Sequence, residues 1–119
     1  METNVKEQER RHSVINALWL RLAADNLSRT TDNYLSTMHD NPDNLFHYSG
    51  QIGSLVDMCN DLLANDRSLI PHYLKKAYIS NYKELSSWLD YLEKHDIFSE
   101  KEVEILYDDY KSLVEETDR

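Results

Sequence analysis

The segment from Val14 to Ala24 contains more apolar residues than one face of a helix can hold. Successive residues of an α-helix are about 100° apart when viewed along the axis. With this spacing, one stripe consists of Ile15, Leu18, Trp19, Leu22 and Asn26, and a nearly opposite stripe consists of Leu20, Leu27, Thr31, Tyr34 and Met38. A helix that is apolar on two sides needs two partners. We expect the rest of the chain to cover one side, and either a second copy or a different protein to cover the other.

Glycine and proline are scarce, with two of each in the whole chain. These residues form tight turns and phosphate-binding loops, so their scarcity favours long helices. A chain of 119 residues also has the size of one domain with one hydrophobic core. We therefore expect a single all-α domain over residues 1–119.

Four helical segments are predicted, and the first is much longer than the last. They cover residues 4–39, about 42–65, from after Ser68 to about 95, and from Ser99 to about 116. Short connections favour antiparallel neighbours, which predicts an antiparallel four-helix bundle, regular or irregular. Because the lengths do not match, the first helix either protrudes or is kinked between residues 28 and 33, where weak helix formers gather.

Apolar periodicity predicts the buried side of each later helix. In the second helix the stripe is Leu45, Tyr48, Ile52, Leu55, Val56, Cys59 and Leu63. In the third it is Leu74, Tyr78, Tyr82, Leu85, Trp88, Leu89 and Leu92. In the fourth it is Val103, Leu106, Tyr107, Tyr110, Leu113 and Val114. The fourth helix begins with a capping box, Ser99 with Glu102, and Phe98 and Val103 have the spacing of a hydrophobic staple.

The sequence contains no pattern typical of catalysis or metal binding. Cys59 is the only cysteine, and its place on an apolar stripe predicts a buried, inert thiol. The pair Glu9 and His12 has the spacing used in di-iron bundles, but such a site needs two pairs and two further carboxylates. We therefore expect no enzymatic activity, no cofactor and no bound metal.

The first residues and the lengths of the apolar runs indicate the cellular compartment of the protein. The first residues lack the basic-then-apolar order of a secretory signal, and no run of about 18 apolar residues is present. A single cysteine also excludes a disulfide within the chain. We expect a cytoplasmic protein that does not bind membranes.

Negative charge is concentrated at the carboxyl end. The net charge is −9, and residues 84–119 hold four basic and twelve acidic side chains. Such a surface repels phosphate backbones, so we expect no direct binding of nucleic acid. In an antiparallel bundle Glu115, Glu116 and Asp118 would lie beside Lys6, Arg10 and Arg11. Alternatively, these three acids contact a basic partner.

Taken alone, the sequence favours a small non-enzymatic protein-protein interaction module: a regulator, inhibitor, immunity factor or adaptor. The predicted partner-binding residues are Ile15, Leu18, Trp19 and Leu22 on the extra apolar face of the first helix, and a homodimer is one form of this hypothesis. The alternative is an acidic decoy, or nucleic-acid mimic, that occupies a basic groove on a nucleic-acid-handling protein. Salt separates the two, because an apolar interface survives added salt and a decoy weakens steeply.

Overall fold

All the regular structure in the described residues is helical, as the sequence predicts. The computed structural model describes residues 2–40, 43, 45–77 and 79–117. Within these ranges the helices are α1 (Glu2–Asp40), α2 (Leu45–Leu63), α3 (Ile70–Lys76), α4 (Tyr82–Lys94) and α5 (Glu100–Thr117). The all-α prediction is confirmed, but the described chain has five helices where four were expected.

The first helix runs without a break through residues 28–33 and protrudes. Its 39 residues correspond to about 58 Å of helix, and the longest dimension of the molecule is also 58 Å. Side-chain contacts hold the weak helix formers in place. The Arg29 guanidinium pairs with the Asp25 carboxylate at 3.0 Å and lies over the Tyr91 ring, and the Thr30 side chain is buried.

The predicted third helix is divided into α3 and α4. The side chain of Asn81 accepts a hydrogen bond from the backbone N–H of Glu84 at 3.0 Å, which caps a new helix at this point. The break changes the phase of the apolar stripe, so Tyr82 is exposed while Leu85, Leu89 and Leu92 remain buried. Tyr78, another member of the predicted stripe, lies outside the described residues.

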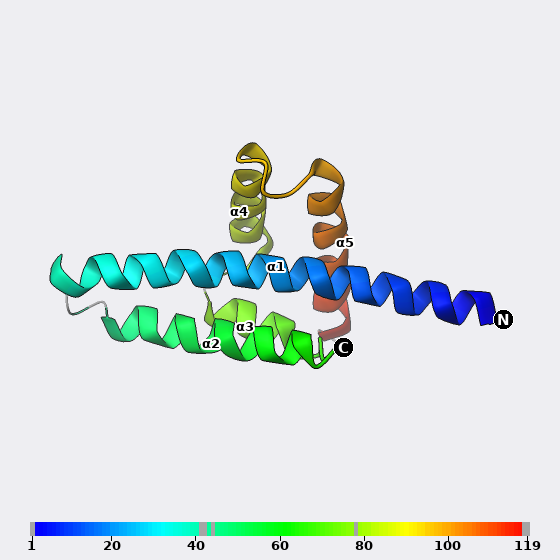
Figure 1. Cartoon of the computed structure of the whole chain (residues 1–119), viewed down its shortest axis with the longest axis horizontal. Coiled ribbons are helices and arrows are strands. Elements are labelled where there is room, and N and C mark those ends of the chain that lie inside the picture. Colours follow the sequence, from blue (N-terminus) through cyan, green and yellow to red (C-terminus); the bar gives the residue numbers. More distant parts are fainter. Residues whose placement is uncertain (1, 41–42, 44, 78, 118–119) are drawn as a thin grey trace.

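The helices do not form an up-and-down bundle. α2 pairs along its length with the later part of α1 as an antiparallel hairpin, whereas α4 and α5 stand across α1 (Figure 1). α5 packs on α1, α3 and α4. At one end the hairpin extends past the other helices, and at the opposite end the first turns of α1 extend alone (Figure 1).

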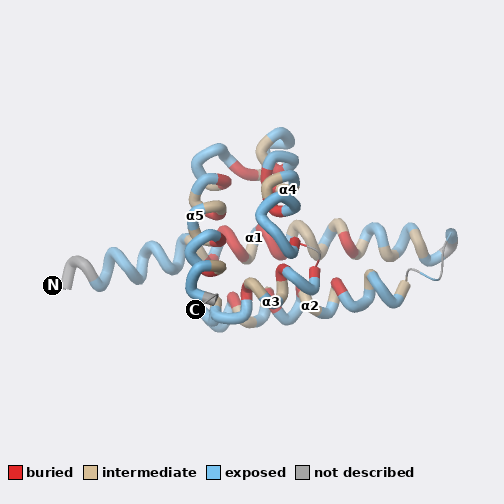
Figure 2. Tube along the Cα trace, turned by 180° about the vertical axis from the view of Figure 1, so that it is seen from behind, coloured by how far each residue is buried: buried red, intermediate tan, exposed pale blue. Residues whose placement is uncertain are grey.

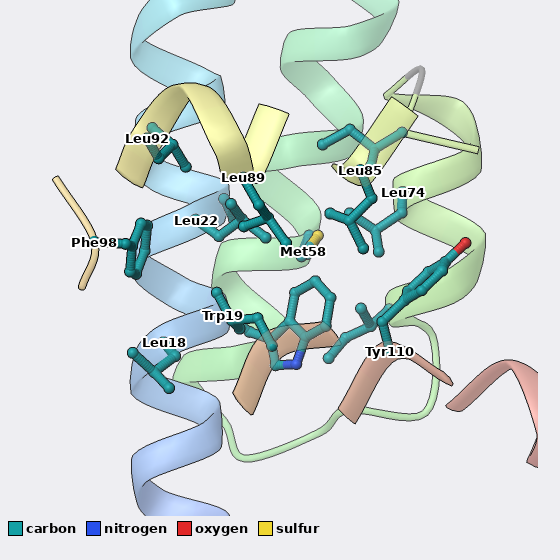
Figure 3. Close-up of a cluster of buried hydrophobic side chains, with 14 of the residues drawn as sticks. Leu18, Trp19, Leu22, Met58, Leu74, Leu85, Leu89, Leu92, Phe98 and Tyr110 are labelled. Atoms are coloured by element: carbon teal, nitrogen blue, oxygen red, sulfur yellow. The ribbon is translucent and has the colours of Figure 1, made fainter. Parts of the chain in front are cut away.

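The core lies where α5 crosses α1. Trp19 and Leu22 of α1 meet Met58 of α2, Leu74 of α3, and Leu85 and Leu89 of α4 (Figure 3). Toward the free end of the hairpin buried residues become sparse (Figure 2). The predicted apolar side of the last helix is confirmed: Val103, Leu106, Tyr110 and Leu113 are buried there.

Candidate interaction surfaces

The four predicted partner-binding residues lie on the side of α1 that faces the rest of the chain. Leu18, Trp19 and Leu22 are buried in the core, and Ile15 is half-buried at its margin. The Trp19 ring packs against Tyr110, with 6.4 Å between the ring centroids. The chain thus covers this stripe itself. The second stripe of α1 lies mostly outside the core, although its first residue, Leu20, packs against the core.

A polar group within the core fixes α5 across α1. The Asp109 carboxylate accepts hydrogen bonds from the Trp19 indole N–H and from the Arg67 guanidinium. Both members of this ion pair are largely buried. Because Asp109 joins α1, α5 and the segment between α2 and α3, we interpret this group as structural.

The second stripe of α1 runs along the edge of the helix that adjoins α2, at the outer side of the hairpin. Leu20, Leu27, Thr31 and Tyr34 are half-buried, and Met38 is 51% exposed. Their positions are nearly opposite Leu18 and Leu22, which face the core. This side of α1 therefore points away from α5.

A matching stripe on α2 adjoins it. Leu45, Ile52 and Cys59 are half-buried, Val56 is 40% exposed and Leu63 is 67% exposed. On the other side of α2, the Asp61 carboxylate accepts a hydrogen bond from the Tyr73 hydroxyl of α3 at 2.5 Å. Since the stripe lies roughly opposite Asp61 on the helix, it too points away from α3, and Cys59 at its inner edge packs against the core. We call the two stripes together the hairpin face: Leu20, Leu27, Thr31, Tyr34 and Met38 with Leu45, Ile52, Val56, Cys59 and Leu63.

The position of this second stripe corrects the sequence prediction for α2. The residues of α2 that are buried are Gln51, Leu55, Met58 and Leu62, so the packed side is rotated from the predicted one and only Leu55 is shared. α2 contacts α1 and α3 at once, and its apolar arc is wider than these neighbours cover. In the sequence, the width of this apolar arc was the feature that indicated an exposed apolar face on α2.

Charged residues are absent from the hairpin face. Between Ser13 and Met38, α1 carries only four charged residues, Arg21, Asp25, Arg29 and Asp32, and all lie on another side of the helix. α2 carries only Asp57 and Asp61, which lie toward α3. In a chain with 29% charged residues, a continuous two-helix face of this kind is a candidate binding surface.

A second surface is an open cleft between α1 and α5. It has a volume of about 780 Å³ and is lined by Glu7, Arg10, Arg11, Val14, Ile15, Ile105, Asp108, Asp109 and Ser112. Its lining thus combines three apolar side chains with charged side chains of both signs. The described residues supply no pair of catalytic side chains in hydrogen-bond contact there.

The acidic carboxyl end does not lie where an antiparallel bundle would place it. The middle of α5, with Asp108 and Asp109, borders the cleft beside Arg10 and Arg11. Glu115 and Glu116 are exposed and take part in none of the ion pairs found among the described residues. Asp118 lies outside the described residues.

Cys59 is half-buried rather than fully buried. Burial raises the pKa of its thiol, which disfavours the reactive thiolate. In the described part of the chain, no three His, Cys, Asp or Glu side chains gather in a way that could hold a metal ion. None of the described helices has both the length and the apolar character of a membrane span.

Comparisons with known proteins give no further guide to the site. Neither a protein-family model, nor a curated protein, nor a solved structure matches the chain.

Proposed function

We propose that the protein is a non-enzymatic interaction module, of the regulator, inhibitor, immunity-factor or adaptor kind, that binds another protein through the hairpin face. One observation carries the proposal: a partly exposed apolar face without charge extends over both α1 and α2. Burial of apolar surface is the main source of affinity in such contacts. The module would act by occlusion or by scaffolding rather than by making or breaking bonds.

Affinity capture from extracts of cells that make the protein tests this proposal. Val56→Glu places a charge in the middle of the hairpin face, at a site that is already 40% exposed. Leu69→Glu is the matched control, because Leu69 is 45% exposed and lies between α2 and α3, outside the hairpin face. We expect the wild type and the control to retain a partner, also in high salt, and Val56→Glu to lose it. Equal retention by all three proteins would contradict the proposal.

A second candidate function rests on the exposed acids of α5. Glu115 and Glu116 lack ion-pair partners in the described part of the chain, which favours contact with a basic partner, as in the acidic-decoy hypothesis. Replacing both by glutamine should then slow association and flatten its salt dependence. If capture is unchanged by this double substitution and is insensitive to salt, the decoy hypothesis is wrong.

A further inference from the structure

The apolar residues of the hairpin face follow the same spacing on both helices. On α1, Leu20, Leu27, Thr31 and Met38 are separated by seven, four and seven residues. On α2, Leu45, Ile52, Val56 and Leu63 are separated by the same intervals. A 7-4-7 pattern reads the same in both chain directions. Apart from Tyr34 and Cys59, each stripe is therefore symmetric about its own midpoint, near residue 29 on α1 and near residue 54 on α2.

The two midpoints lie at nearly the same level of the hairpin. The Asn16 side chain contacts the Asn65 side chain at 3.3 Å, which fixes how the antiparallel helices are aligned. Continued along the hairpin, that alignment brings residue 29 close to residues 52–54. A two-fold axis across the hairpin at this level interchanges the two ends of each stripe, apart from Tyr34 and Cys59.

From this symmetry we infer that the occupant of the hairpin face is a second copy of the chain, seated face to face with the two hairpins antiparallel. A two-fold axis at this level places Leu20 opposite the partner's Met38, Leu27 opposite the partner's Thr31, and Ile52 opposite the partner's Val56. It also sets the bulky Tyr34 opposite the partner's Ala24, a small residue. Isologous contacts of this kind are the commonest form of protein self-association.

Charge favours the same arrangement. Two chains of net charge −9 repel each other, so a contact between copies needs a surface without charge, which the hairpin face provides. Antiparallel hairpins also place the exposed acids at the hairpin end, Asp40 and Asp43, at opposite ends of the dimer.

The size of the face is sufficient. From Leu20 to Met38 the helix rises about 27 Å, and two helices side by side are about 20 Å wide. The footprint is thus about 540 Å² per copy, so a dimer buries about 1,100 Å² in total. This figure treats the face as flat and leaves out the additional surface of protruding side chains. A specific interface needs about 1,000 Å².

This inference rests on the proposed function, since it names the partner of the same face. Light scattering during gel filtration, over a range of concentrations, tests it with the full chain. We expect the wild type and Leu69→Glu to reach twice the mass of one chain, with no loss of dimer at high salt. Val56→Glu and Val56→Lys should each weaken dimerisation more than about a hundredfold, because like charges then meet near the axis.

Mixing the two variants gives the decisive result. A mixture of Val56→Glu and Val56→Lys should recover the dimer, because residue 56 of each copy lies near residue 56 of the other across the axis. Circular dichroism confirms that each variant is folded. A mixture that stays monomeric while the wild type dimerises would overturn the antiparallel arrangement. A wild type that stays monomeric at high concentration would overturn the dimer, whereas the proposed function would fail only if capture were also unaffected by Val56→Glu.

Discussion

At Asp109, hydrogen bonds from two distant parts of the chain meet on one carboxylate. Trp19 lies 90 residues before Asp109 and Arg67 lies 42 residues before it. Both charges of the Arg67–Asp109 pair are largely removed from water. A buried pair of this kind adds little net stability relative to apolar residues, but loss of one member leaves the other charge unpaired.

Asp109→Ala should therefore be strongly destabilising. We expect a loss of about 3–5 kcal/mol in the free energy of unfolding, because the Arg67 guanidinium is left without its carboxylate. Urea denaturation followed by tryptophan fluorescence measures this loss, and Trp19 reports directly on the site. The double variant Arg67→Met/Asp109→Leu should lose less than Asp109→Ala. If the double variant is the less stable of the two, the unpaired charge is not the cause.

The hydrogen bond between Tyr73 and Asp61 predicts a pH effect on stability. The Asp61 carboxylate accepts from the Tyr73 hydroxyl and raises the pKa of Tyr73 to about 12, from an ordinary value of 10.0. The protonated phenol is the form that the fold favours. Its contribution to stability is thus complete below the unfolded-state pKa and is lost as the pH rises toward the folded-state value.

Tyr73→Phe should accordingly cost stability at neutral pH and cost less at about pH 12, where the wild type has lost the same contribution. The measurement is the difference in unfolding midpoint between wild type and variant at several pH values. Taking the difference removes the titration of all other groups. A difference that stays constant up to about pH 12 would show that this hydrogen bond does not set the pKa of Tyr73.

Among the elements, the start of α5 is the one that its own sequence specifies most completely. The Ser99 hydroxyl accepts from the backbone N–H of Glu102 at 3.2 Å, and the Glu102 carboxylate accepts from the backbone N–H of Ser99 at 3.2 Å. Phe98 and Val103 are both buried, as a hydrophobic staple requires. The predicted capping box is thus confirmed.

Ser99→Ala should lower the free energy of unfolding by about 0.5–2 kcal/mol, because the first turn of α5 loses an acceptor. Chemical denaturation should show a lower midpoint with an unchanged slope. Ser87→Ala is the control, since Ser87 is an exposed residue inside α4. Alanine is the better helix former there, so this variant should be equal to the wild type or slightly more stable. A larger loss in Ser87→Ala than in Ser99→Ala would contradict the assignment.

Local signals predicted much of the fold, and contacts between elements decided the rest. The capping box at Ser99 and the apolar side of α5 follow from residues close in sequence. The break between α3 and α4 has a local signal as well, the pair Asn81 and Glu84, but continuous apolar periodicity across it predicted one helix. The uninterrupted course of α1 through Thr30 depends on its packing against α2 and on Tyr91 of α4, which no local pattern reveals.

The same distinction applies to the candidate site. Two apolar stripes on α1 were recognisable from periodicity, whereas the choice of the stripe that forms the core was not. That choice depends on the crossing of α5, which brings Asp109 to Trp19. On α2, Val56 and Leu63 lie on an apolar arc, and only the positions of α1 and α3 determine which part of the arc stays exposed.

For the molecule as a whole, packing is densest where the five helices meet and decreases toward the end of the hairpin (Figure 2). Protection from amide hydrogen exchange should follow the same gradient. We expect amides of residues 16–23 to exchange slowest in α1, and those of residues 33–38 to exchange much faster in dilute protein. Exchange followed by mass spectrometry measures both segments in one experiment.

Hydrogen exchange can also be compared between low and high protein concentration. Raising it should slow exchange in residues 33–38 of the wild type but not of Val56→Glu, because only the wild type would cover the hairpin face. Equal protection of both α1 segments in dilute protein would show that the hairpin end is held by more than the contacts described above.

The continuity of α1 places a strict limit on changes in its length. A residue inserted in a loop changes only the loop. A residue inserted in a helix rotates all the following residues of that helix by about 100° and shifts them by about 1.5 Å along the axis. Trp19 in the core and Met38 near the hairpin end belong to one uninterrupted helix. A single insertion or deletion between Leu22 and Leu27 would turn Tyr34 and Met38 off the outer side while Trp19 kept its place. Sequences that share this architecture should therefore vary in length in the connections between helices and keep the interval from Trp19 to Met38 constant.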